Sequence, residues 1–125
     1  VPATDTPGAR AVGVPQFIER AVGDWCSPAQ AKLLRSGLDQ LDADAHAAGG
    51  SAFADLTAAQ QTALLARYDK GGDAQRPFFG LLKELTTIGY FTSKPGATVA
   101  LRYDPVPGEY RGCVPLKEIG RAWAT

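Results

Sequence analysis

The residues best suited to chemistry are few, and they begin with a single histidine. His46 follows Asp42 by one helical turn, and Asp44 lies between them on a different face of the expected helix. A divalent metal site needs three or more ligands, which this group does not bring to one side. Asp39, Asp42 and Asp44 also resemble a calcium loop, but the glycine required at its sixth position is missing. We therefore interpret these residues as a solvated acidic helix face and expect no metal site.

The two cysteines, Cys26 and Cys113, are the only thiols in the sequence. Cys26 stands just before an expected helix start, where a thiolate can be stabilised, so a reactive thiol is one alternative. A second is a disulfide between the two, which in the chain-entropy model would stabilise the fold by roughly 4–5 kcal/mol. Two unrelated buried thiols are the third, and spacing alone leaves all three open.

The sequence contains no other constellation that is typical of catalysis or cofactor binding. A serine triad needs a base that a third group holds, and the chain has one histidine and no Gly-x-Ser-x-Gly segment. No Gly-x-Gly-x-x-Gly segment follows an expected strand, and no phosphate-binding loop is present. We therefore expect no catalytic, cofactor-binding or metal-binding residue, and we predict a binding or structural role.

The composition predicts one globular domain over residues 1–125. Apolar residues make up 45% of the chain, and 13 basic residues balance 13 acidic ones. The zero net charge argues against a nucleic-acid binder and against a polybasic membrane anchor. No run approaches the roughly 20 apolar residues of a membrane span. Because the chain begins Val1-Pro2-Ala3-Thr4 and has no methionine, we expect that a leader was removed or that the chain was trimmed.

Capping signals mark two of the four expected helices. Ser27-Pro28-Ala29-Gln30 and Thr57-Ala58-Ala59-Gln60 are capping boxes, the first with proline at the first helical position. They open helices that are expected to end at Gly49-Gly50 and near Tyr68. A shorter helix is expected over 14–22. One-sided spacing predicts that these three helices bury Val14, Phe17, Ile18, Ala21, Val22, Leu34, Leu38, Leu41, Ala45, Ala59, Leu64, Leu65 and Tyr68.

The expected structure changes along the chain. Residues 1–12 should be an extended arm and 13–91 a helical body. Residues 92–125 should form a turn, a short helix over 97–103 and an extended tail, because prolines and glycines interrupt it. Alternation typical of strands is almost absent. We predict an all-α fold, a small irregular bundle of about four helices with a long extended C-terminal tail.

The fourth helix, expected over 77–91 with Asp73 as its cap, carries only two charges in fifteen residues. Its apolar side chains go almost all the way round, so nearly every side must be covered. One interpretation is a core helix under its own tail. The other is a partner interface, in which aromatic residues and arginine are enriched. We predict an interface of Phe78, Phe79, Leu82, Tyr90, Phe91, Arg102, Tyr103, Tyr110 and Arg111.

The same region resembles a known family. The segments that carry the resemblance are Phe78-Phe79-Gly80-Leu81-Leu82-Lys83-Glu84-Leu85-Thr86, Gly89-Tyr90-Phe91-Thr92-Ser93, and 101–113 with its Arg111-Gly112-Cys113 ending. Together with Pro7-Gly8-Ala9 and Phe17-Ile18-Glu19-Arg20, they are similar to the gluconate 2-dehydrogenase subunit 3 family. Lys94-Pro95 departs from the family pattern, in which an acidic and then an aliphatic residue follow Thr-Ser.

The resemblance implies a non-catalytic small subunit. Such a subunit binds and stabilises, and helps to export, the FAD-containing large subunit of a sugar, sugar-acid or glycoside dehydrogenase of the glucose–methanol–choline type. The resemblance also implies a c-type cytochrome as a frequent electron acceptor, a twin-arginine leader and a periplasmic location. The cysteine of the Gly112-Cys113 motif supports the disulfide with Cys26.

Two other hypotheses remain beside the subunit. The first is a free-standing exported helical protein that binds a small ligand in a pocket lined by Phe78, Phe79, Tyr90 and Tyr103. The second is an enzyme in its own right that uses a thiol. A disulfide would exclude the second, because it removes the thiol from chemistry.

Overall fold

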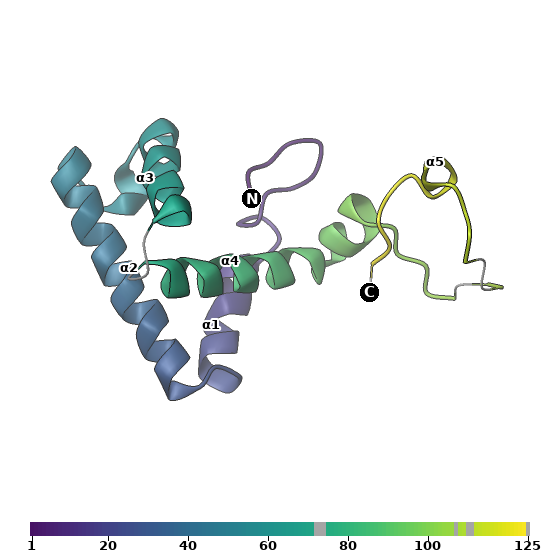
Figure 1. The fold of residues 1–125 in the computed structure, drawn as a ribbon, viewed down its shortest axis with the longest axis horizontal. Helices are drawn as coiled ribbons and strands as arrows, with labels where there is room; N and C mark the ends of the chain where they lie inside the picture. The colour runs from purple at the N-terminus through teal and green to yellow at the C-terminus, as the bar shows by residue number, and fades with distance from the viewer. Residues whose placement is uncertain (72–74, 107, 110–111, 125) are drawn as a thin grey trace. The chain divides into compact units, whose positions relative to one another are not determined.

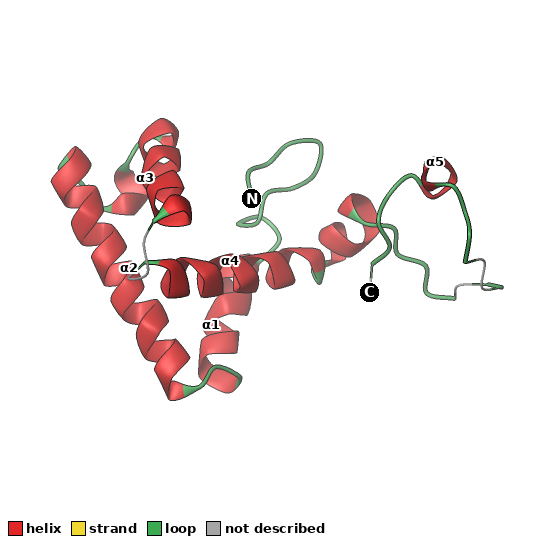
Figure 2. Ribbon diagram, viewed as in Figure 1, coloured by secondary structure: helices red, strands yellow, loops and turns green. Residues whose placement is uncertain are grey.

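The computed structural model describes residues 1–71, 75–106, 108–109 and 112–124. Helices dominate it, as Figures 1 and 2 show, and the only strand-like pairing in these residues is an isolated bridge. The prediction of an all-α fold is therefore confirmed. The elements in chain order are α1 (Val14–Asp24), α2 (Pro28–Gly49), η1 (Phe53–Asp55), α3 (Ala58–Lys70), α4 (Arg76–Phe91), η2 (Gly96–Ala100) and α5 (Leu116–Ile119).

The chain divides into two compact units. Unit 1 comprises Val1–Glu19 and Thr86–Thr125, and unit 2 comprises Arg20–Leu85. Helices α1 and α4 each contribute residues to both units. The single domain expected over 1–125 stays a prediction.

Both predicted capping boxes are present in unit 2. The Ser27 hydroxyl accepts a hydrogen bond from the Gln30 backbone N–H at 3.3 Å, and the Gln30 side chain accepts one from the Ser27 backbone at 2.9 Å. Thr57 and Gln60 make the same reciprocal pair at the start of α3. Helix α2 ends at Gly49 and is capped by Gly50, whose φ of 74° lies in the left-handed region that favours glycine. Each such N-cap typically contributes about 1 kcal/mol, so local sequence accounts for these helix ends.

The core of unit 2 forms where α4 meets α2 and α3. The Phe78 side chain is 3% exposed, and its ring lies against Gly37 of α2, where a Cβ would overlap it. The Tyr68 ring of α3 meets the Phe78 ring edge-on with 6.1 Å between centroids. Removing a buried ring of this kind typically costs about 3–5 kcal/mol. The other buried apolar side chains of the unit are Ala21, Ala31, Leu34, Leu41, Ala45, Leu56, Leu64 and Leu85.

Some expectations about burial and helix ends were wrong. Leu38 is 48% exposed, because α4 packs on the neighbouring Gly37 rather than over Leu38. Ala59 in the first turn of α3 is also exposed. Helix α1 continues to Asp24, two residues beyond its expected end. The expected cap of α4, Asp73, lies outside the described residues.

Unit 1 is organised around Tyr90, the next-to-last residue of α4. Its side chain is 3% exposed, and its hydroxyl lies 2.9 Å from the Thr6 hydroxyl and donates to the Pro7 carbonyl at 3.1 Å. The N-terminal arm, expected to be extended, is a loop that folds back so that the Ala9 N–H donates to the Val1 carbonyl at 3.0 Å. These bonds hold the arm on the end of α4.

Two glycines allow close packing in unit 1. A Cβ on Gly89 of α4 would lie 2.6 Å from the Phe17 ring of α1, and one on Gly96 would overlap the Tyr90 carbonyl. Gly96 begins η2, a wide turn in which the Leu101 N–H donates to the Gly96 carbonyl five residues back, at 2.9 Å. The short helix expected over 97–103 is therefore present as this single turn.

The described part of the tail closes on itself, so a long extended tail is not confirmed. Arg102 forms an isolated parallel bridge with Trp123. The Arg102 N–H donates to the Ala122 carbonyl at 2.8 Å, and the Ala124 N–H donates to the Arg102 carbonyl at 2.9 Å. The short helix α5 lies between the two paired segments. This closure brings together residues that are about twenty positions apart in the sequence.

The contact between Phe78 and Gly37 makes a stability prediction with a matched control. Gly37→Ala should lower the free energy of unfolding by about 1–3 kcal/mol, because the added methyl group enters the space of the Phe78 ring. Gly23→Ala in α1 meets nothing within 4 Å and should raise stability by up to about 1 kcal/mol through helix propensity. Urea unfolding followed by far-UV circular dichroism measures both. Equal stability of Gly37→Ala and the parent would contradict the described contact.

Candidate functional site

The predicted interface residues on α4 differ in burial. Phe78 and Tyr90 are each 3% exposed and belong to the chain's own core. Phe79 and Leu82 are half-buried. Phe91 is 39% exposed, although its ring also contacts the Tyr90 ring edge-on at 5.3 Å between centroids. Of the α4 residues predicted for a partner interface, Phe91 is therefore the most accessible.

The predicted interface residues of the tail are accessible where the structure describes them. Arg102 is exposed, and Tyr103 is 56% exposed. Tyr110 and Arg111 lie outside the described residues. The predicted tail surface is thus represented in the structure by Arg102 and Tyr103, which follow Leu101 at the end of η2.

Exposed apolar side chains concentrate in the last third of the chain. Nine large apolar side chains are exposed among the described residues, and six of them fall between positions 88 and 123. We call these six the exposed apolar group: Ile88, Phe91, Val99, Tyr103, Val106 and Trp123. Single exposed apolar residues are normal, whereas a contiguous patch of them marks an interaction surface.

Sequence reasoning included only Phe91 and Tyr103 of this group. Ile88 had a detectable signal, because it precedes Phe91 by three positions and so shares its helix face. Val99, Val106 and Trp123 had none. Val99 lies in the single turn η2, and Val106 and Trp123 lie in irregular segments, so no periodicity tells an exposed side chain from a buried one. Their exposure follows from the way the tail folds.

Two arginines line a hollow of about 320 Å³ in unit 1. Arg102 and Tyr103 come from the segment after η2, and Arg121 comes from the returning end of the tail. Leu101 and Ile119 add apolar wall. The Arg102 guanidinium lies over the Trp123 ring, 4.3 Å from its centroid, in a cation–π contact.

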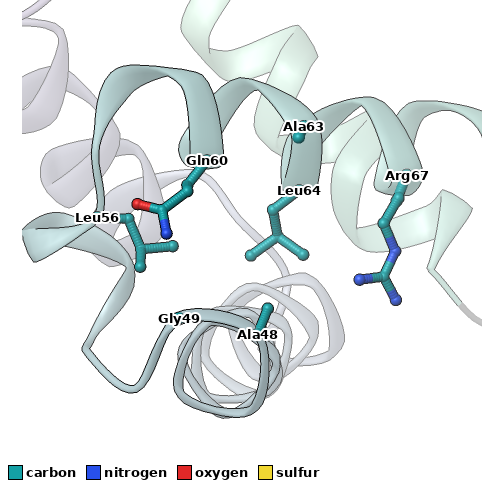
Figure 3. A pocket seen from close by; sticks show the side chains of 7 residues that line it. All are labelled: Ala48, Gly49, Leu56, Gln60, Ala63, Leu64 and Arg67. Carbon is teal, nitrogen blue, oxygen red and sulfur yellow. The ribbon is translucent and has the colours of Figure 1, made fainter.

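A smaller hollow of about 140 Å³ lies in unit 2 between the last turn of α2 and helix α3. Figure 3 shows Leu64 pointing from α3 toward Ala48 and Gly49, with Leu56 at one end. Its polar side chains are Gln60 and Arg67, one toward each end of the row in α3. The combination suits a small apolar group with an acidic or carbonyl oxygen.

Next to this hollow, a partly buried hydrogen bond joins α2 to α3. The Tyr68 hydroxyl donates to Asp44 Oδ2 at 2.8 Å, and the Gln40 side chain donates to Asp44 Oδ1 at 2.8 Å. The bond from Tyr68, followed by that from Gln40, lowers the pKa of Asp44 below its ordinary value. Burial, reinforced by the bond to Asp44, raises the pKa of Tyr68 to about 12. Both shifts favour the state in which tyrosine is neutral and aspartate charged.

The family model of gluconate 2-dehydrogenase subunit 3 matches residues 1–108. The chain belongs to this family. Comparison with curated proteins finds no match, and comparison with solved structures finds none either. The resemblance seen in the sequence is confirmed.

Family membership makes this chain an accessory subunit of a dehydrogenase complex and implies association with a larger dehydrogenase subunit. The matched range includes α1 to α4, η2 and five of the six members of the exposed apolar group. Only Trp123 lies beyond it.

The other residues considered for metal binding or catalysis either form hydrogen bonds within the fold or do not come together in a site. Asp42 accepts a hydrogen bond from the Phe53 N–H at 2.9 Å and so holds η1 on α2, while His46 is exposed. In the described ranges, no three His, Cys, Asp or Glu side chains come together as metal ligands. Cys26 is half-buried and Cys113 exposed, each as a free thiol. None of the described helices has the length and apolar character needed to cross a membrane.

The Tyr68–Asp44 bond predicts a specific response to alkaline pH. Because the pKa of Tyr68 is raised in the folded state, its contribution is complete below its ordinary pKa near 10 and is lost as pH rises through about 12. Tyr68→Phe should lower the free energy of unfolding by about 1.5–3 kcal/mol at pH 8, and this difference from the parent should shrink between pH 10 and 12.

Urea unfolding at several pH values measures the difference. Tyr103→Phe serves as the matched control, because Tyr103 is 56% exposed and its loss should change stability little at any of these pH values. A Tyr68→Phe deficit that stays constant up to pH 12 would show that the hydroxyl does not carry the contribution assigned to it.

Proposed function

We propose that this chain is the non-catalytic small subunit that binds and stabilises the FAD-containing large subunit of a sugar, sugar-acid or glycoside dehydrogenase. Candidate reactions of the large subunit are gluconate 2-oxidation and glycoside 3-oxidation. Membership of the family supports the subunit role. The observation from the structure that supports a partner surface is the exposed apolar group between positions 88 and 123.

The proposed surface has the composition of a subunit interface. Ile88 and Phe91 are 41% and 39% exposed on adjacent turns of α4, and Tyr103 is 56% exposed. Completing the burial of a large apolar side chain contributes up to about 1.5–3 kcal/mol. Aromatic residues and arginine are enriched at the centre of interfaces, and Arg102 stands beside Tyr103. If the large subunit covers these side chains, the burial of each one favours binding.

We assign the redox chemistry of the complex to the partner. The proposed large subunit is of the glucose–methanol–choline type and holds FAD, and a c-type cytochrome can accept its electrons. We further propose a periplasmic complex in which this subunit carries a twin-arginine leader and assists export of the folded flavoprotein. These proposals are supported by the resemblance in residues 78–113 and by the family membership.

A second candidate function is favoured by the hollow between α2 and α3. It is largely apolar, with Gln60 and Arg67 as its polar side chains, so a free-standing protein could bind a small amphiphilic molecule there. This pocket is not the one expected from the sequence, since Phe78, Phe79, Tyr90 and Tyr103 do not line it. A rise in melting temperature with a small ligand and no partner would favour this function.

Substitutions in the exposed apolar group test the proposed subunit contact. Ile88→Asp and Phe91→Asp should each weaken binding to the large dehydrogenase subunit by about thirtyfold or more, because a hot-spot loss of about 2 kcal/mol corresponds to that factor. Co-expression, affinity capture of this chain and titration of the purified subunits measure the loss. Leu38→Asp is the matched control, because Leu38 is 48% exposed but belongs to unit 2. Failure of the parent chain to bind any flavoprotein subunit would contradict the proposal.

The predicted disulfide between Cys26 and Cys113 has its own test. A chain purified from an oxidising compartment should have an intact mass about 2 Da below that of the reduced form. Reduction, or the double change Cys26→Ser with Cys113→Ser, should lower the free energy of unfolding by about 4–5 kcal/mol in the chain-entropy model. Two alkylatable thiols in the native protein would contradict the disulfide and return the thiol hypothesis to consideration.

A further inference from the structure

The hollow lined by Arg102 and Arg121 has the features of an anion site. Both guanidinium groups carry a permanent charge, and the hollow they line has a volume of about 320 Å³. None of the described residues in its wall has an acidic side chain. The one ion pair between described residues joins Lys83 to Asp69 and involves neither arginine. Two like charges at one hollow repel each other, so an anion placed there would be favoured by both.

The tail holds each guanidinium in place. Arg102 is fixed through its backbone by the bridge to the segment around Trp123, and its side chain stacks on the Trp123 ring. Its Nη1 also lies 3.5 Å from the Ile119 carbonyl. The Nη1 of Arg121 donates to the Val99 carbonyl. Each guanidinium has five N–H donors, so these bonds orient the group and leave most of its donors free for a ligand.

The backbone between Arg102 and Arg121 explains why both side chains line the same hollow. Gly120, with a φ of 77°, turns the chain directly before Arg121. Leu101 and Ile119 flank the arginines in the wall of the hollow. A planar carboxylate suits this arrangement, because it accepts two parallel hydrogen bonds from an arginine fork.

We infer that this hollow binds a carboxylate of the large dehydrogenase subunit, from an aspartate, a glutamate or the chain end. The inference rests on the proposed function and gives its partner surface an ionic centre. The two positive charges of the hollow fit a negatively charged group of the partner. Continuity with the exposed apolar group also supports the inference, since Val99, Tyr103 and Trp123 adjoin the residues of the hollow in sequence or by contact. Apolar anchors around a charged pair exclude water from it.

The first experiment measures affinity for the large subunit at low and high salt. Arg121→Gln should weaken binding by about tenfold or more, and it should flatten the salt dependence, because one charge of the contact is gone. Arg121→Lys should lose less, since it keeps the charge and lacks only the fork. Arg35→Gln on α2 is the matched control, because it removes one exposed positive charge from unit 2 and should leave affinity unchanged.

Arg102→Gln adds a readout of tail structure. The stack on Trp123 can be followed by tryptophan fluorescence in a Trp25→Phe background, where Trp123 is the remaining tryptophan. Arg121→Gln should leave that signal unchanged while it weakens binding. If Arg121→Gln instead alters the fluorescence as strongly as Arg102→Gln does, its effect is structural and the carboxylate site is refuted.

The second experiment uses the full chain without its partner and so separates the inference from the proposed function. Acetate, malonate, gluconate and phosphate are titrated while the arginine Nε–Hε signals are followed by NMR. Shifts of the Arg102 and Arg121 signals with acetate and malonate, absent in Arg121→Gln, support a carboxylate site even if no large subunit binds. A response to phosphate alone overturns it. Much tighter binding of gluconate, with large-subunit affinity unaffected by Arg121→Gln, also overturns it and points to a soluble sugar acid.

Discussion

Helix α4 is apolar around most of its circumference, and the rest of the structure follows from how its side chains are covered. In unit 2, the Phe78 ring fills the space that Gly37 leaves on α2 and meets Tyr68 of α3. In unit 1, the Tyr90 hydroxyl forms hydrogen bonds with Thr6 and Pro7 of the N-terminal arm. Both cores therefore depend on aromatic residues of one helix, and what these contacts leave uncovered is available to a partner.

The division between covered and uncovered side chains fits an accessory subunit. The carboxylates of Asp44 and Asp42 accept hydrogen bonds that hold α3 and η1 against α2. Ile88 and Phe91, in contrast, are more exposed than large apolar residues of a compact protein usually are. These two carboxylates thus stabilise the fold, whereas burial of the exposed apolar side chains would supply the free energy for binding a partner.

The tail shows how an irregular segment can make a defined surface. Its bridge between Arg102 and Trp123 fixes two backbone hydrogen bonds, and the cation–π stack adds a side-chain contact at the same place. Ordering such a segment costs conformational entropy, which these contacts offset. The result is a hollow with two oriented arginines next to exposed aromatic residues. Such a surface offers both affinity and orientation to a partner.

The sequence by itself determined the helix starts at Ser27 and Thr57, the glycine end of α2 and the family, because caps and motifs depend on residues a few positions apart. Only the tertiary structure decided that Phe78 is buried while Phe91 is exposed, although both lie on one apolar helix. It also decided that Leu38 is exposed and that Arg121 and Arg102 line the same hollow. The reason is that the burial of a side chain depends on which distant segment of the chain packs against it. The same holds for which side chains lie close together, and a local sequence pattern does not specify this packing.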